Sequence, residues 1–297
     1  LNIDMFTSGT DSALIGSIDS VSDGEGGYEI VQNQGLLGGN KCLNFDEGSI
    51  LLQSNPKQFF SEVILYLQQA MNPVGSHSNT LTKHMKNGTV ETESRVSFWI
   101  TSFPPSGVKE YVLTKGLFQR VLLLYRPWSD DMRQMVSERR MSGVFKDKLT
   151  EVQSLEDIAQ HFIRIREKTE ARLLNCVDMT QQEWEELSPA GKEDVARACA
   201  HDMFTVDPSF EPQLLASTEE YYTLVRGMEK HLSDVVCSFI PNILSYTCLF
   251  ATHLALARIE RDNIPFDGEW KVTGDDVETA TEILYDIYEQ LVLWLES

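Results

Sequence analysis

Two adjacent carboxylates, Asp46 and Glu47, follow the short apolar stretch Cys42–Phe45 and precede Gly48. Enzymes that hydrolyse nucleoside triphosphates need such a pair: one acid holds Mg²⁺ with its water shell, and the other polarises the water that attacks the γ-phosphate. A buried parallel strand is a near-continuous apolar run, and its carboxyl end places both acids at one edge of the sheet. The same residues also fit a strand that simply leaves into a polar loop, so both interpretations stay open.

Two further apolar runs carry polar groups that fit the same chemistry. Thr101 and Ser102 follow the run Val96–Ile100, where a hydroxyl would donate a hydrogen bond to the γ-phosphate or to water. Arg120 precedes the run Val121–Tyr125, and an arginine that reaches the transferred phosphoryl group contributes about 10³–10⁵ in rate. A strand-end cap is the alternative for Thr101, and a surface salt bridge is the alternative for Arg120. Other cations that would fill the role of Arg120 are Arg95, Arg126 and Lys115.

A polar segment, residues 74–94, lies between the two predicted strands and contains the turn signal Asn87-Gly88. It predicts a hairpin at the place where ring helicases insert a pore loop. Lysines and small polar groups suit phosphate contacts that do not read the bases. The candidate nucleic-acid residues are Lys83, His84 and Lys86. A plain exposed hairpin is the alternative.

The elements that must position these groups fall into two regimes. Residues 1–127 alternate short apolar runs with helices and turns, which predicts an α/β region, and residues 128–152 form a predicted linker. Residues 153–297 are helical almost throughout, which predicts an all-α region. Helices are expected near residues 153–176, 189–204, 212–236, 240–261 and 275–296.

Shorter features complete the expected organisation. Residues 10–18 predict a helix and the Gly-rich residues 22–40 predict a loop. Residues 270–272 predict a short strand. Thr273 and Asp276, three residues apart at the start of the last helix, predict a capping box with Asp in place of Glu.

Charge and cysteine content restrict the class of protein. The 297 residues carry a net charge of −20, which is unevenly placed. Residues 1–150 hold 14 Lys and Arg against 16 Asp and Glu, whereas residues 151–297 hold 11 against 29. This argues against a protein that coats DNA by bulk attraction. Five widely spaced cysteines without a Cys-x-x-Cys pair argue against a disulfide framework or zinc site and favour a reducing, cytoplasmic compartment.

Targeting segments are not evident in the sequence. No run of about 18 apolar residues indicates a membrane span, and the acidic start does not resemble a secretory signal. The chain starts with Leu1 in place of Met, so we expect a fragment or a processed product.

A phosphate-binding loop is missing from the sequence, in which Gly-x-x-x-x-Gly-Lys-[Ser/Thr] does not occur. The nearest stretch, Gly38–Lys41, leads into a predicted strand and therefore cannot cradle phosphates on a helix N-terminus. Residues 3–6 followed by Thr7-Ser8-Gly9-Thr10 look like the strand and helix start that come just after such a loop. We therefore expect the loop upstream of this chain.

The ordered set of motifs resembles the helicase-like P-loop ATPase domains of phages, plasmids and mobile elements, often fused behind a primase. The matching features are a Thr-led helix at Thr10–Leu14, the strand that ends in Asp46-Glu47, the hairpin, the polar strand end at Thr101, and the segment Gly116–Leu122. In the C-terminal part, Leu254–Arg258, Val272-Thr273 and Ala280 look similar to the family's last helices.

That resemblance implies a partial RecA- or AAA-like sheet followed by a C-terminal helical domain. It implies ATP and Mg²⁺ as cofactors, with Asp46 as metal ligand and Ser102 near the nucleotide. It implies catalytic roles for Asp46, Glu47, Thr101 and Arg120, and single-stranded DNA, a homo-oligomeric ring and replication proteins as partners.

Two rival classes fit parts of the same evidence. A non-catalytic, ATPase-derived binding or assembly protein fits the missing phosphate loop and the acidic helical half. A nuclease would use Asp46 and Glu47 with Mg²⁺. Such a site also requires a lysine on the next strand, where this chain has Arg95.

Overall fold

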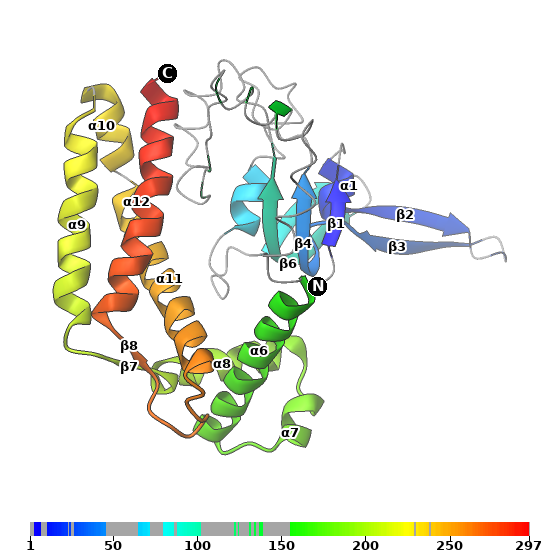
Figure 1. Ribbon diagram of the computed structural model, residues 1–297. Helices are drawn as coiled ribbons and strands as arrows, with labels where there is room; N and C mark the ends of the chain where they lie inside the picture. Colours follow the sequence, from blue (N-terminus) through cyan, green and yellow to red (C-terminus); the bar gives the residue numbers. More distant parts are fainter. Residues whose placement is uncertain are drawn as a thin grey trace. The chain divides into compact units, whose positions relative to one another are not determined.

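The computed structural model describes residues 3–6, 11–22, 24, 27–45, 65–71, 80–85, 88–101, 122, 124, 131, 134, 137–138, 155–228, 230–237 and 239–296. The chain divides into two compact units, Leu1–Leu122 and Leu123–Ser297 (Figure 1). The first unit is α/β and the second is helical, as the sequence predicts. The predicted linker, residues 128–152, lies largely outside the described residues.

A mixed four-stranded sheet organises the first unit. Its strands are β1 (Ile3–Phe6), β4 (Gly39–Phe45), β6 (Gly88–Ile100) and β5 (Thr80–Met85), in that order across the sheet. The first three run parallel, and β5 pairs with β6 in the antiparallel direction. The predicted separate strand at residues 96–100 is the end of β6, because the second arm of the hairpin continues without a break into the sheet.

The core of the first unit joins this sheet to helical residues. Leu43 and Phe45 of β4 are buried, and the Phe45 ring centroid lies 6.0 Å from that of Phe98. Leu67, in the helical stretch of residues 65–70, and Leu14, in helix α1 (Asp11–Ile15), bury their side chains in the same cluster. Removing this apolar surface from water is the main force that holds β4 at the centre of the sheet.

Residues 10–40 differ from the sequence-based prediction. The helix α1 ends at Ile15, and a strand, β2 (Gly16–Ser22), follows at once. Gly16 makes this change of direction with φ of +121°, which a residue with a side chain rarely adopts. The predicted loop contains β3 (Tyr28–Gln34), which pairs with β2 in a two-stranded antiparallel ribbon, and it also contains the start of β4. Glycines on both sides hid the β-forming stretch Tyr28–Val31.

Gly35 lies where the chain crosses the end of α1 at very close range. The N–H of Leu36 donates to Ala13 O at 2.9 Å, and that of Leu37 donates to Leu14 O at 2.7 Å. A Cβ atom on Gly35 would lie 2.4 Å from backbone atoms of Leu14 and Ile15.

We therefore expect Gly35→Ala to lower the free energy of unfolding of the first unit by about 2 kcal/mol, the cost of overpacking a site with no room. Urea denaturation followed by circular dichroism measures it. Gly227→Ala is the matched control, because the nearest atom to its new Cβ is Leu224 O at 3.7 Å. Gly227 belongs to the second unit, so each variant is compared with the wild-type transition of its own unit, and equal losses of unfolding free energy would contradict the expectation.

Seven helices and a small parallel ribbon are described in the second unit. The helices are α6 (Leu155–Val177), α7 (Gln181–Glu186), α8 (Pro189–Met203), α9 (Phe210–Arg226), α10 (Lys230–Cys237), α11 (Ile240–Arg261) and α12 (Gly274–Glu296). The ribbon pairs β7 (Thr205–Val206) with β8 (Lys271–Val272), which confirms the predicted strand there. The predicted helix at residues 212–236 is two helices, α9 and α10, which separate after Gly227.

The start of α12 carries the predicted cap. The backbone N–H of Thr273 donates to Asp276 Oδ2 at 2.9 Å, and the N–H of Asp276 donates to Thr273 Oγ1 at 3.4 Å. Asp276 is buried and also receives the Arg258 guanidinium, whose Nη2 atom lies 2.7 Å from Oδ2. The same Nη2 donates to Lys271 O at 2.8 Å. This network ties α11, β8 and α12 together.

One helix among the described residues, α11, is long and apolar enough to cross a membrane by length and composition. A single helix of this kind is weak evidence, because the core helix of a soluble protein meets the same criteria. Ala251 and Ala255 of α11 are buried in a cluster with Val277 and Ala280 of α12. The expectation that the chain has no membrane span, and with it the cytoplasmic location, stays a prediction.

Candidate functional site

The carboxyl ends of three parallel strands meet at one edge of the sheet. Phe6 of β1 is the register partner of Phe45 in β4, and Phe45 is the partner of Ile100 in β6. In open α/β sheets, ligands bind in the crevice outside the carboxyl ends of the strands. Asp46 follows Phe45 directly in the sequence, so the chain passes from β4 to the predicted acids at this edge.

Thr101 is the predicted site residue that the structure describes here. Its N–H donates to Phe45 O at 2.9 Å, so the position after β6 lies beside the end of β4. The predicted adjacency of Thr101 and the Asp46 strand is therefore present in the backbone. Its hydroxyl donates to the same carbonyl at 3.3 Å, which is the strand-end cap of the alternative interpretation.

The remaining predicted residues at this edge lie outside the described residues. They are Asp46, Glu47, Ser102 and Arg120. Within the described ranges, no group of three or more His, Cys, Asp or Glu side chains is placed to hold a metal ion. Mg²⁺ and ATP therefore remain predictions that depend on Asp46 and its neighbours.

The predicted hairpin is present, but its two described basic residues do not act together. Lys83 and His84 are consecutive in β5, so their side chains point to opposite faces. His84 Nδ1 lies 3.0 Å from Thr89 Oγ1 on an exposed face that also carries Glu91 and Glu93. Lys83 is half-buried on the other face, and Lys86 lies outside the described residues. The carboxylates beside His84 repel phosphates, which counts against nucleic-acid binding on that face.

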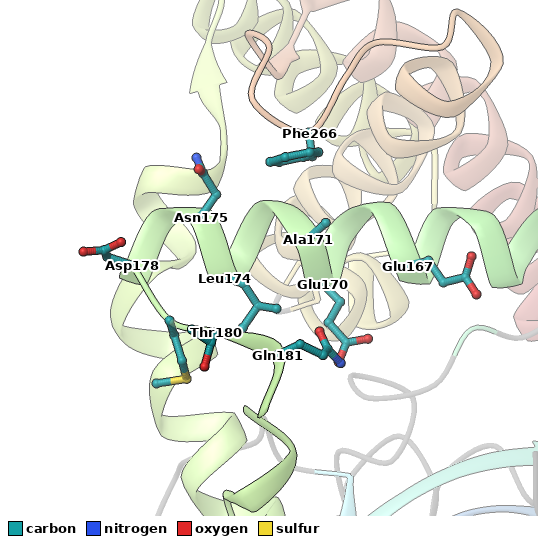
Figure 2. Close-up of a pocket in the computed structure, with 10 residues that line it drawn as sticks. Glu167, Glu170, Ala171, Leu174, Asn175, Asp178, Thr180, Gln181 and Phe266 are labelled. Atoms are coloured by element: carbon teal, nitrogen blue, oxygen red, sulfur yellow. The ribbon is translucent and has the colours of Figure 1, made fainter. Parts of the chain in front are cut away.

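A second candidate site, which the sequence analysis missed, is a hollow of about 510 Å³ in the helical unit (Figure 2). One face of α6 forms it, together with the start of α7 and Phe266 from the loop before β8. The signal in the sequence is the spacing of Glu167, Glu170 and Leu174, which puts them on one face of α6, and Asp178 follows the end of that helix. No sequence pattern places Phe266 beside them.

Comparisons with known proteins add no family to these observations. No family model matches the chain, and no curated protein matches it either.

Proposed function

We propose that this chain is part of a helicase-like ATPase that acts on single-stranded DNA in the replication of a phage or mobile element. The observation that carries it is the junction of β4 and β6, where the N–H of Thr101 donates to Phe45 O directly before Asp46. The parallel order β1-β4-β6 is compatible with a RecA- or AAA-like sheet, in which nucleotide phosphates bind at this edge.

Four residues would carry the chemistry. Asp46 would hold Mg²⁺, since carboxylate oxygens suit this cation, and Glu47 would orient and polarise the attacking water. Arg120 would reach the phosphates, in the same subunit or across a subunit boundary of a ring. The backbone N–H of Thr101 would hold the ends of β4 and β6 together. The hydroxyls of Thr101 and Ser102 would donate hydrogen bonds to the nucleotide. When bound, Mg²⁺ neutralises charge on the phosphate oxygens.

A phosphate-binding loop is a further requirement of such an ATPase. The 297 residues contain no Gly-x-x-x-x-Gly-Lys-[Ser/Thr] sequence, so the proposed activity would require such a loop from outside these residues. In a RecA-type order, the loop would come before β1.

The first test is made on the protein expressed from its natural start. ATP hydrolysis is measured with and without single-stranded DNA, and the melting temperature with and without Mg²⁺ and ATP. We expect single-stranded DNA to stimulate hydrolysis and nucleotide to raise the melting temperature. A melting temperature that no nucleotide changes would overturn the proposal.

The second candidate is a non-catalytic binding or assembly protein derived from an ATPase fold. Three observations favour it: the Thr101 hydroxyl is used within the sheet, the exposed face of the hairpin carries acids, and residues 151–297 are strongly acidic. Such a protein would show no effect of nucleotide on stability, so the same melting experiment separates the two functions.

A further inference from the structure

The hollow is lined on one side by α6 and bordered by Phe266 and the start of α7. Its α6 residues recur every three or four positions, and they include Glu167, Glu170 and Leu174. Figure 2 shows Phe266 above this face of the helix and Gln181 below it. At about 510 Å³ the hollow has the size of a ligand site. It is open to solvent, so a peptide segment of another protein can enter and leave it.

None of the four cations of α6 lines the hollow. Arg164, Lys168 and Arg172 recur every four residues and are used within the fold, whereas Arg166 is exposed and precedes Glu170 by four residues without an ion pair in the described part of the chain. Arg164 Nε lies 2.6 Å from Glu260 Oε1, and Lys168 Nζ donates to Ile259 O at 3.4 Å. The unit therefore neutralises Glu260 with its own cations.

The acids on the hollow side have no such partners. Glu167, Glu170 and Asp178 form no ion pair within the described part of the chain. Glu167 and Glu170 are three residues apart on one helical face, where like charges repel each other. A cation placed between them would relieve this repulsion.

Hydrogen bonds hold the backbone of the loop that carries Phe266, and the Phe266 ring is exposed. Arg172 Nη1 donates to Phe266 O at 3.0 Å and to Gly268 O at 3.1 Å. Trp270 Nε1 donates to Pro265 O at 3.0 Å, and the Trp270 ring is fully buried. The Phe266 side chain, by contrast, is 44% exposed. An exposed aromatic face beside carboxylates is the arrangement that attracts an organic cation.

We propose that this hollow binds a basic peptide segment of a protein partner, with a Lys or Arg side chain between Phe266 and the carboxylates of Glu167 and Glu170. Asn175 offers an amide at the rim to the peptide backbone. The half of the chain that contains the hollow has 29 acids against 11 Lys and Arg, which matches a basic partner and repels nucleic acid. The binding is independent of the ATPase proposal.

The test is fluorescence anisotropy with the whole chain and two labelled peptides, acetyl-ARARA-amide and acetyl-AEAEA-amide, at physiological salt. The double variant Glu167→Gln/Glu170→Gln removes two charges from the hollow. Glu278→Gln/Glu282→Gln removes two charges from exposed positions on α12 and is the matched control. We expect the hollow variant to weaken binding of the basic peptide about tenfold, Phe266→Ala to weaken it about fivefold, and the control to change it less than about twofold.

Three results would overturn the proposal. Equal loss of affinity in the hollow and control variants would mean that only the overall negative charge attracts the peptide. Unchanged binding by Phe266→Ala, with circular dichroism unchanged, would remove the aromatic edge from the site. Spermine that binds as tightly as the peptide, with the same dependence on Glu167 and Glu170, would make the ligand a small polycation in place of a protein partner.

Discussion

Replacing Glu47 with Gln is expected to lower ATP hydrolysis by the full-length protein about 10²–10⁴-fold and to leave ATP binding intact. The amide has nearly the shape of the carboxylate, but it cannot polarise the attacking water as a base does. Binding depends on contacts with the phosphates and the base, which Glu47 does not make in the proposed site. Turnover with and without single-stranded DNA, together with the nucleotide-dependent melting temperature, measures both quantities.

Glu91→Gln is the matched control for this substitution. Glu91 is exposed on the hairpin and is paired in register with Thr82, nine residues before the end of β6. The Glu91→Gln substitution makes the same change of charge and shape far from the carboxyl end of β4. The turnover of this variant is therefore expected to equal that of the wild type. Unchanged turnover in Glu47→Gln would remove Glu47 from the catalytic machinery.

Replacing Asp276 with Asn is expected to lower the free energy of unfolding of the helical unit by about 3 kcal/mol. The substitution leaves the Arg258 guanidinium, only 27% exposed, without its counter-charge. It also weakens the cap, because Asp276 Oδ2 accepts from the backbone N–H and the hydroxyl of Thr273, both at 2.9 Å. Urea denaturation followed by the helical circular dichroism signal measures the change.

Asp275→Asn separates this network from a general charge effect. Asp275 is the neighbouring acid in the first turn of α12, and it is exposed. Losing its interaction with the helix dipole costs about 0.5 kcal/mol. Similar losses in the two variants would show that the buried pair with Arg258 contributes nothing beyond the position of a charge at the helix start.

The contribution of Asp276 is expected to depend on pH. Burial alone would raise the pKa of Asp276, but the hydrogen bonds from Arg258 and Thr273 outweigh it, so the pKa lies below its ordinary value. A carboxyl whose pKa is lowered by folding stabilises the folded state above the unfolded pKa of about 3.9, and this is lost as the pH falls through the folded pKa. The stability difference between wild type and Asp276→Asn should be full at about pH 7 and shrink at about pH 3. A difference that is constant over this range would contradict the assignment.

Local signals in the sequence determined the elements whose structure depends on near neighbours. Apolar residues at helical spacing predicted the helices of the second unit, and the pair Thr273 and Asp276 predicted the cap of α12. Both signals act within one or two helical turns, where side-chain periodicity and capping hydrogen bonds are encoded directly. The hairpin β5-β6 was predictable for the same reason, since Asn87-Gly88 joins strands that are close in sequence.

Local sequence patterns did not predict the structure correctly at two places where glycines weaken the preference for a helix or a strand. The ribbon β2-β3 lies between glycine-rich stretches, so its short β-forming runs were read as loop. The division of α9 from α10 falls near Gly227 and Met228, within a continuous apolar pattern. In both places pairing or packing with other elements decides the structure, because the local preference is small.

The candidate sites depended on contacts between residues far apart in sequence. The motif order predicted that Thr101 would lie beside the strand of Asp46, but only the sheet register placed its N–H on Phe45 O, 56 residues away. In the hollow, Arg172 donates a hydrogen bond to Phe266 O, and the two residues are 94 positions apart in the sequence. A periodic pattern of apolar residues does not predict a contact over that distance. Sequence alone proposed the candidate residues at the sheet edge and predicted most of the helices and strands around them. Tertiary structure decided which of them meet, because register and helix packing are set by the burial of surfaces that are distant along the chain.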